Sequence, residues 1–369
     1  MHCALLLLFA AAAAAARAPG AAAAANDNDE RGFAAWQSRH GVTFSTPQET
    51  AMRFGRWGAN HRLVSAHNSQ QPPPSYTLEM NAFAHLSFEE FSSIYLSVRA
   101  PSGQGKLRAK TPTRTPSATP TARLAPSATP TISLSRSATP SPGSAPPTTD
   151  WLAAPNTVVV PVRDQMQCGA CWAFSAAEAY GSAVALKTGL PVVAFSEQQL
   201  VSCSTSFGNS GCAGGWMVSA FQYIKTLPQG LCLATQYPYT SGTGSNGACA
   251  IPASCSTLTT PPIKIIVEVT SGAPGATAQG DTEAALAKQP LSVAVTASSA
   301  FQLYAGGTFS STTCADSAVN HAVLLVGTTA GTYTIQNSWG TGWGTAGRMV
   351  MAKGPTYNPR GVCNIQRCG

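Results

Sequence analysis

Hydrophobic and polar residues follow different patterns in different parts of the chain, and each pattern predicts a different kind of segment. An apolar run from Ala4 to Ala16 opens the sequence, and a second alanine tract after Arg17 ends at Ala25. About 13 apolar residues are too few to span a bilayer, but they suit the core of a secretory signal peptide. We therefore expect residues 1–25 to be a signal peptide, although no Lys or Arg precedes the run.

Residues 26–100 have a helical pattern. From Glu49 to Asn68, six residues recur at intervals of three and four and therefore share one helical face; they are Glu49, Arg53, Trp57, Asn60, Val64 and Asn68. On residue types alone this segment is an amphipathic helix with an ion pair between Glu49 and Arg53.

Residues 101–147 lack apolar residues to bury. The sequence Ser-Ala-Thr-Pro recurs there at positions 117–120, 127–130 and 137–140. Proline removes backbone donors, so we expect an extended, solvated linker. Ser, Thr and Pro together are also typical of an O-glycosylated stalk, and an unmodified flexible linker fits equally well.

Residues 148–369 mix helical and strand patterns with frequent turns. They contain ten of the 11 cysteines, a density that predicts disulfides in an oxidising compartment. The one histidine of this part, His321, excludes a multi-histidine metal site, and no Cys/His spacing suits zinc. We expect no metal ion and no organic cofactor.

The charge distribution argues against nucleic-acid binding. The formal net charge is +7, and almost all of the excess lies in the linker, which has six basic residues and no acidic one. The C-terminal part is nearly balanced, so a basic binding face there is not expected. No segment after the N-terminal run is apolar enough to predict a membrane span.

The chemistry-bearing residues lie in three separate motifs. A strand-like run at 158–162 leads into a loop and then into a helix that begins at Cys171. A thiol at a helix N-terminus is favoured as thiolate, the form that attacks carbonyl carbon. His321 is the available base, and Asn337 could orient its ring. Gln165 could donate its amide to a developing oxyanion beside the backbone N–H of Cys171.

The spacing Cys168-Gly-Ala-Cys171 has a second interpretation. A C-x-x-C is also the motif of thioredoxin-like redox sites. That chemistry would leave the His321 and Asn337 motifs without a role.

These motifs resemble the papain family of cysteine peptidases. The resemblance covers essentially all of 148–369, in order, and includes Gln165–Trp172, Ser196–Cys203, Gly211–Gly215, Tyr237–Tyr239, Gln289–Val293, Phe301–Gly307, Val319–Ala322 and Asn337–Gly344. It implies an α+β fold of two subdomains, a helical left side begun by the Cys171 helix and a β-barrel-like right side that carries His321 and Asn337.

The resemblance also assigns roles to residues. It implies that Cys171 is the nucleophile, His321 the base and acid, Asn337 the orienting group and Gln165 an oxyanion-hole donor. Trp339 would shield the contact between His321 and Asn337 from water. The substrate-binding positions that it implies are Gly214, Gly215, Trp216, Met217, Val319, Asn320, Ala322, Trp339 and Cys368.

Two finer expectations follow from the same resemblance. The resemblance places Cys368 at the floor of the pocket that binds the second substrate residue before the cut (P2). The other residues implied for this pocket are apolar, which implies a preference for Leu, Val or Phe at P2. The disulfides implied are Cys168–Cys212, Cys203–Cys249 and Cys314–Cys363, while Cys232 and Cys255 are additional cysteines that could form a fourth.

The N-terminal half resembles the inhibitory propeptide of the same family. The resemblance rests on the 49–68 helix and on residues 76–91. It departs at Glu79, where Gly is usual, and at His85, where the family has an Asp tied to pH-sensitive release. The four propeptide histidines, at 40, 61, 67 and 85, offer another acid trigger if any of them is packed in the neutral form.

The sequence therefore predicts the zymogen of a secreted or lysosome/vacuole-type cysteine endopeptidase. Its segments are a signal peptide (1–25), a helical inhibitory propeptide (26–100), a repeat linker (101–147) and the peptidase (148–369). Its partners would be polypeptide substrates and its own propeptide, and we expect a monomer. The alternatives are a catalytically inactive papain-like binding protein on a mucin-like stalk, and acyl transfer or peptide ligation at the same site.

Overall fold

The computed structural model of the protein describes residues 19–99, 148–153, 157–255, 276–311, 314, 318–354 and 361–365. The signal-peptide core, the linker and Cys368 lie outside these residues. Among the described helices, none is long and apolar enough to cross a membrane.

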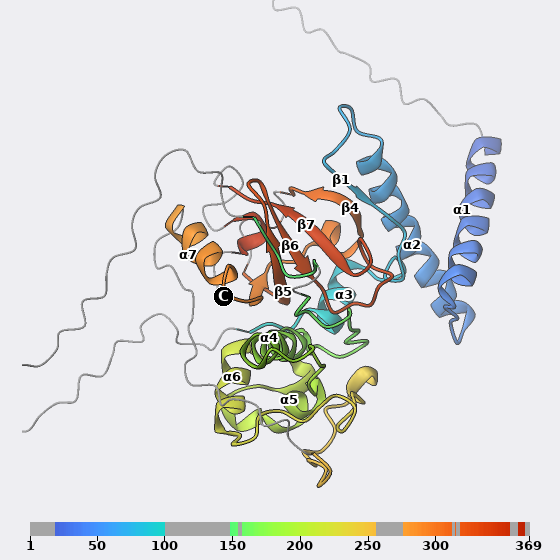
Figure 1. Ribbon diagram of the computed structural model, residues 1–369. Coiled ribbons are helices and arrows are strands. Elements are labelled where there is room, and N and C mark those ends of the chain that lie inside the picture. Colours follow the sequence, from blue (N-terminus) through green and yellow to red (C-terminus); the bar gives the residue numbers. More distant parts are fainter. Residues whose placement is uncertain are drawn as a thin grey trace, which may run out of the picture.

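A helical subdomain forms one half of the C-terminal part, residues 148–369. It contains α4 (Cys171–Thr188), α5 (Glu197–Cys203) and α6 (Met217–Thr226), which lie together in Figure 1. α4 carries small and apolar residues on all of its faces, among them Ala173, Phe174 and Ala177. Most of the helix is therefore buried on every side. Gly189, in the left-handed conformation, ends the helix.

A mostly antiparallel sheet forms the other half. Its strands are β2 (Thr149–Asp150), β3 (Leu291–Val295), β4 (Tyr304–Phe309), β5 (His321–Thr328), β6 (Thr332–Gln336) and β7 (Arg348–Ala352). β5 is buried along its whole length and pairs with β2, β3 and β6. The short helices α7 (Ala276–Leu286) and α8 (Ser299–Gln302) accompany the sheet.

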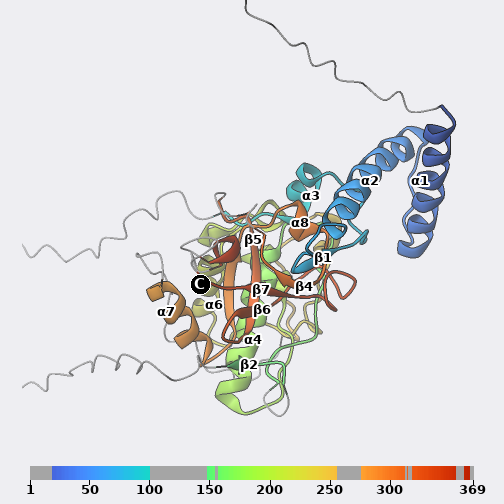
Figure 2. The same cartoon turned by 90° about the horizontal axis from the view of Figure 1, so that it is seen from above.

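The N-terminal segment, predicted to be a propeptide, packs against the sheet through a strand of its own. It comprises α1 (Pro19–His40), α2 (Pro47–Asn68), β1 (Tyr76–Leu78) and α3 (Phe88–Tyr95). β1 pairs antiparallel with β4 and so extends the sheet of the peptidase. Figure 2 shows α1 and α2 lying together as a pair beyond this edge. The expected face of α2 is present, with Trp57 and Val64 buried.

Two local predictions were wrong. The strand-like run at 158–162 forms no strand; Val159 and Val160 are instead buried without regular pairing, Val159 in an apolar cluster with Leu324 and Val326 of β5. Conversely, residues 76–78 form a strand inside a segment predicted as helical, because the free edge of β4 supplies the partner.

Candidate active site

Cys171 is the first residue of α4 and is completely buried. The preceding loop is fixed by a disulfide between Cys168 and Cys212. Among the described cysteines, Cys171 is the one free thiol. The structure therefore places a single unpaired sulfur at the N-terminus of a buried helix.

His321 and Asn337 come from neighbouring strands and form a pair. His321 is the first residue of β5, and Asn337 follows directly after β6, which pairs with β5. His321 Nε2 lies 2.8 Å from Asn337 Oδ1. Because that oxygen accepts only, Nε2 carries the proton and Nδ1 is the basic nitrogen. Nδ1 has no hydrogen-bond partner within the described part of the chain.

Trp339 covers this pair. Its ring stacks on the imidazole of His321 at 4.5 Å between centroids. On its other sides it contacts Phe91 of the propeptide at 4.9 Å and Trp343 at 5.2 Å. The contact between His321 and Asn337 is consequently excluded from water.

Hydrogen bonds at both ends of its amide group fix the orientation of the Gln165 side chain. The hydroxyl of Ser338 donates to Gln165 Oε1 at 2.7 Å. Gln165 Nε2 in turn donates to the carbonyl of Cys168 at 2.9 Å and to the carbonyl of Tyr95 at 3.0 Å. The donor expected to bind an oxyanion is therefore engaged by a propeptide carbonyl.

The predicted propeptide runs over Cys171 directly after α3. The hydroxyl of Ser97 lies 3.9 Å from the Cys171 sulfur and donates to the carbonyl of Gly169. The next residue, Val98, bonds through its N–H to the Asn320 carbonyl at 3.1 Å and pairs with Gly215. A side chain at Gly169 would collide with Ser97, so glycine is required there.

Burial keeps both reacting groups neutral in this state. It raises the pKa of the Cys171 thiol, although backbone groups of Ser97, Ala322 and Trp172 oppose the rise. It lowers the pKa of His321 to about 4, against a smaller opposing effect of Asn337. In this state, desolvation under the propeptide therefore acts against the thiolate that the helix dipole favours.

Most of the predicted substrate-binding residues surround Ser97 and Val98. Gly214 and Gly215 contact this segment through their backbones. Trp216, Met217 and Ala322 share a buried apolar cluster with Val98, and Val319 packs against it. Cys368 lies outside the described residues, so the floor of this pocket is not described.

Four disulfides stabilise the peptidase part. They are Cys168–Cys212, Cys203–Cys249, Cys232–Cys255 and Cys314–Cys363. Three are the pairs that the resemblance implies, and the additional cysteines form the fourth. Within the described residues, no group of three His, Cys, Asp or Glu side chains could hold a metal ion.

Sequence reasoning missed three residues that support the site. Tyr239 donates through its hydroxyl to the carbonyl of Gln165 at 2.8 Å, and Ser338 orients the Gln165 side chain. Glu178 lies inside α4, two turns after Cys171, and is buried. Only the position of Ser338, directly after Asn337, could have indicated its role.

Comparison with known families matches two separate parts of the chain. A model described as papain family cysteine protease matches residues 145–368. A model described as cathepsin propeptide inhibitor domain (I29) matches residues 33–91. Ser97 and Val98, the residues that lie over Cys171, fall between the two matched ranges.

Individual relatives match over nearly the whole chain. Cathepsin L 2 of Paramecium tetraurelia is 30% identical over 90% of this chain and 89% of its own length. Pro-cathepsin H of Bos taurus is 31% identical over 93% of this chain and 90% of its own. Among solved structures, digestive procathepsin L 3 of Tenebrio molitor superposes with a TM-score of 0.68 at 29% identity, covering 92% of this chain and 97% of that one.

Proposed function

Because this chain belongs to the papain family of cysteine proteases and carries the family's propeptide inhibitor domain, we propose that it is the zymogen of a secretory-pathway endopeptidase with Cys171 as its nucleophile. The observation that carries the proposal is the convergence of Cys171, the His321–Asn337 pair and Gln165 under one propeptide segment.

The reaction follows from the groups that each residue presents. His321 Nδ1 takes the thiol proton of Cys171, and the thiolate attacks the carbonyl carbon of the scissile peptide bond. Gln165 Nε2 and the backbone N–H of Cys171 stabilise the negative oxygen. The C–N bond then breaks, and the imidazolium gives its proton to the leaving amine.

Water completes the cycle. His321 takes a proton from a water molecule, whose oxygen attacks the thioester carbon. The C–S bond breaks, the carboxylic acid leaves, and the thiolate recovers a proton from His321. Asn337 keeps Nδ1 directed to the reacting atoms throughout, because its oxygen holds Nε2–H.

Inhibition by the propeptide has two physical components. The Tyr95 carbonyl takes the Gln165 donor that the oxyanion needs. The segment around Ser97 excludes water from Cys171 and so disfavours charge separation between thiol and imidazole. Withdrawal of residues 95–98 would restore both the donor and the hydration.

Val98 supports an apolar preference at P2. Its side chain is buried in the apolar cluster that also contains Trp216, Met217 and Ala322, where we place the substrate side chain. We expect Leu, Val or Phe there.

The proposed route is the secretory pathway, extracellular or lysosome/vacuole. Four disulfides favour an oxidising compartment, and the apolar N-terminal run supports a leader at 1–25. The remaining boundaries are a propeptide at 26–100, a linker at 101–147 in which maturation cuts, and a monomeric peptidase at 148–369.

The test is acidification of the purified precursor to about pH 4.5 with a Phe-Arg or Leu-Arg fluorogenic peptide, beside a Cys171→Ala control. We expect turnover that the control lacks. Absence of turnover in both proteins, after the propeptide has been shown to be removed, would contradict the proposal.

A further inference from the structure

The helix that begins at Cys171 carries two buried polar side chains on the face of the nucleophile. Ser175 and Glu178 follow Cys171 by four and seven residues, a spacing that places the three side chains on one side of a helix. Ser175 and Glu178 are 3% and 4% exposed. Figure 1 shows α4 at the boundary between the helical subdomain and the sheet. Hydrogen bonds of these two residues therefore can link the two halves of the site.

Ser175 joins α4 to the strand that carries the base. Its hydroxyl donates to the backbone carbonyl of Val323 at 2.8 Å and lies 2.6 Å from the hydroxyl of Ser292 in β3. Val323 stands two residues after His321 in β5. The hydrogen bond thus connects the helix of the nucleophile with the strand of His321.

Glu178 joins α4 to the residue that precedes Asn337. Gln336, the last residue of β6, donates through Nε2 to Glu178 Oε2 at 3.3 Å and to the Val160 carbonyl at 3.0 Å. Arg348 donates twice to Gln336 Oε1, at 2.9 and 3.1 Å. The bonds from Arg348 fix which end of the Gln336 amide faces α4.

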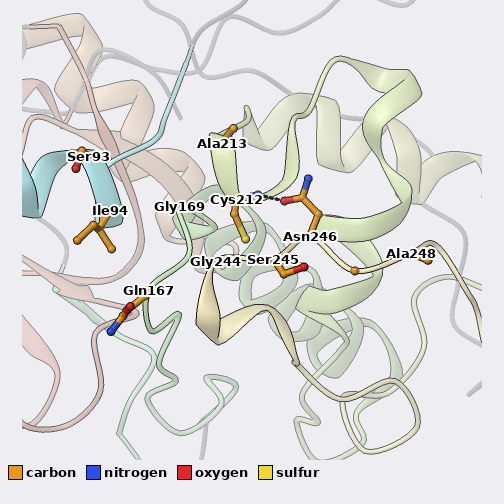
Figure 3. A pocket seen from close by; sticks show the side chains of 11 residues that line it. Ser93, Ile94, Gln167, Gly169, Cys212, Ala213, Gly244, Ser245, Asn246 and Ala248 are labelled. Atoms are coloured by element: carbon orange, nitrogen blue, oxygen red, sulfur yellow. Dashed lines mark hydrogen bonds between the residues drawn. The ribbon is translucent and has the colours of Figure 1, made fainter. Parts of the chain in front are cut away.

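The start of α4 is held by the helical subdomain alone. A disulfide joins Cys168, in the loop before Cys171, to Cys212. Figure 3 shows Cys212 beside Asn246, whose Oδ1 accepts from the Cys212 N–H at 2.7 Å. His321 belongs to the sheet. The separation between sulfur and imidazole is therefore set by the position of α4 against the sheet.

Apolar packing at this boundary does not define that position sharply. Ala179 of α4 shares an apolar cluster with Leu324 and Val326 of β5, but hydrophobic burial has no preferred direction. Hydrogen bonds, in contrast, require defined distances and angles. The precision matters, because a displacement of about 1 Å between reacting groups can cost about 10²-fold in rate.

We propose that Ser175 and Glu178 are positioning residues, which hold the Cys171 sulfur within reach of His321 Nδ1 through their bonds to Val323 and Gln336. They act through the sheet and touch neither substrate nor the reacting atoms. The proposal rests on the proposed function and deepens it, because it names the contacts that set the geometry between nucleophile and base.

The experiment measures alkylation of Cys171 by iodoacetamide against pH in the matured enzyme. A neighbouring imidazolium stabilises the thiolate, so the thiol reacts at lower pH than an isolated one. In Ser175→Ala we expect the acid limb of this profile to move up by about half a pH unit or more, because the pair is held less closely. With a fluorogenic peptide, kcat should fall about tenfold while KM changes by less than about twofold.

Glu178 is tested by a pair of variants. Glu178→Leu removes the acceptor of Gln336 and should change the profile in the same direction as Ser175→Ala. Glu178→Gln keeps an acceptor oxygen at this place and should recover the wild-type profile that Glu178→Leu loses.

Ser182→Ala is the matched control for Ser175→Ala. Ser182 is a buried serine of the same helix, and its hydroxyl donates to the Glu178 carbonyl within α4 at 3.0 Å. The variant loses a buried hydroxyl of the same size but no bond to the sheet, so its alkylation profile should match that of the wild type. The Tm of every variant separates lost stability from lost position.

The outcomes distinguish the two proposals. Identical alkylation profiles in wild type, Ser175→Ala and Ser182→Ala would overturn the positioning role and leave the proposed function intact. If Ser175→Ala does not fold, the Glu178 pair decides, and equal profiles in Glu178→Leu and Glu178→Gln would overturn the role. Absence of turnover in the wild type, after proven removal of the propeptide, would overturn the proposed function and this inference with it.

Discussion

The backbone carbonyl of Tyr95 accepts a hydrogen bond of 3.0 Å from the side-chain amide of Gln165. A propeptide carbonyl therefore accepts the hydrogen bond that we assign to stabilisation of the oxyanion. The neighbouring Ser97 hydroxyl lies 3.9 Å from the Cys171 sulfur, so the propeptide engages the nucleophile and the oxyanion donor at the same time. In the proposed mechanism, inhibition and catalysis therefore use the same two groups.

Replacing Gln165 with alanine should lower kcat far more than it changes KM. The side-chain donor acts on charge that develops in the transition state, and loss of one such donor costs about 10²–10³ in kcat. The measurement is steady-state kinetics of the matured variant, with the active fraction determined by titration with a thiol-reactive inhibitor. A loss confined to KM would contradict the oxyanion role.

Replacing Asn337 with aspartate should move the basic limb of the kcat/KM profile to higher pH. A carboxylate next to His321 favours the imidazolium and raises its pKa, so the thiolate–imidazolium pair persists to a higher pH, by about one unit or more. Asn337→Ala should instead lower kcat without this shift, because the ring loses its orienting acceptor and gains no charge. An unchanged basic limb in Asn337→Asp would show that the two side chains do not interact during catalysis.

The motifs around Cys171, His321 and Asn337 could be recognised from the sequence because each combines a reactive residue with a strand or helix boundary. Strand pairing then brings His321 and Asn337 together, because β5 begins at His321 and its partner β6 ends just before Asn337. The paired cysteines were likewise predictable, since their spacing resembles that of the family.

Other features depend on contacts that residue types do not encode. Every residue has a carbonyl, so nothing distinguishes Tyr95 as the partner of Gln165. Residues 76–78 form a strand only because β4 has a free edge to pair with. Val159 and Val160, in contrast, are buried without being part of a strand. Glu178 is an ordinary helix residue until its helix is enclosed on all sides.

We expect His85 to act as an acid trigger for propeptide release. Its ring lies 5.4 Å from Trp36 and 5.7 Å from Phe44, and its Nδ1 lies 3.0 Å from the Ala82 carbonyl. Burial and the neighbouring Arg53 lower its pKa to about 4, while Glu90 and Glu49 oppose this. The neutral ring is therefore preferred in the folded propeptide, and the stability that depends on it is present above about pH 6.5 and lost as the pH falls through about 4.

We expect His85→Phe, which keeps an aromatic ring but cannot be protonated, to move the midpoint of maturation about half a pH unit or more towards acid. His61→Phe is the matched control, because the His61 ring also packs on an aromatic ring, that of Trp57, while its side chain is 43% exposed and its Nδ1 lies 3.7 Å from Asp29. Maturation would be followed by gel mobility after stepwise acidification. Equal midpoints in wild type and His85→Phe would assign the trigger to another group.

Glu178 should make the folded protein less stable at neutral pH than in acid. Its carboxyl group is buried, with Oε2 at 3.3 Å from Gln336 Nε2 and Oε1 without a partner among the described residues. Burial and the nearby Glu197, itself paired with Arg163, raise the pKa of Glu178 to about 8. A raised pKa means that the folded state holds the proton more tightly, so the stabilisation is complete below about pH 4.5 and is lost as the pH rises through about 8.

Glu178→Gln keeps the shape and removes the ionisation, so it should cancel this loss. In the inactive Cys171→Ala precursor, which cannot digest itself, we expect the Tm of the parent to fall between pH 5 and pH 8 by at least about 4 °C more than that of the Glu178→Gln variant. At pH 5 the two should unfold at similar temperatures, because the protonated carboxyl and the amide make the same contact with Gln336. The control is Glu89→Gln on the exposed start of α3, which should follow the parent at both pH values. If the Tm of Glu178→Gln falls between pH 5 and pH 8 by as much as that of the parent, the carboxyl of Glu178 is already ionised at pH 5. The charges of Arg163 and Arg348 would then stabilise the carboxylate more than burial destabilises it.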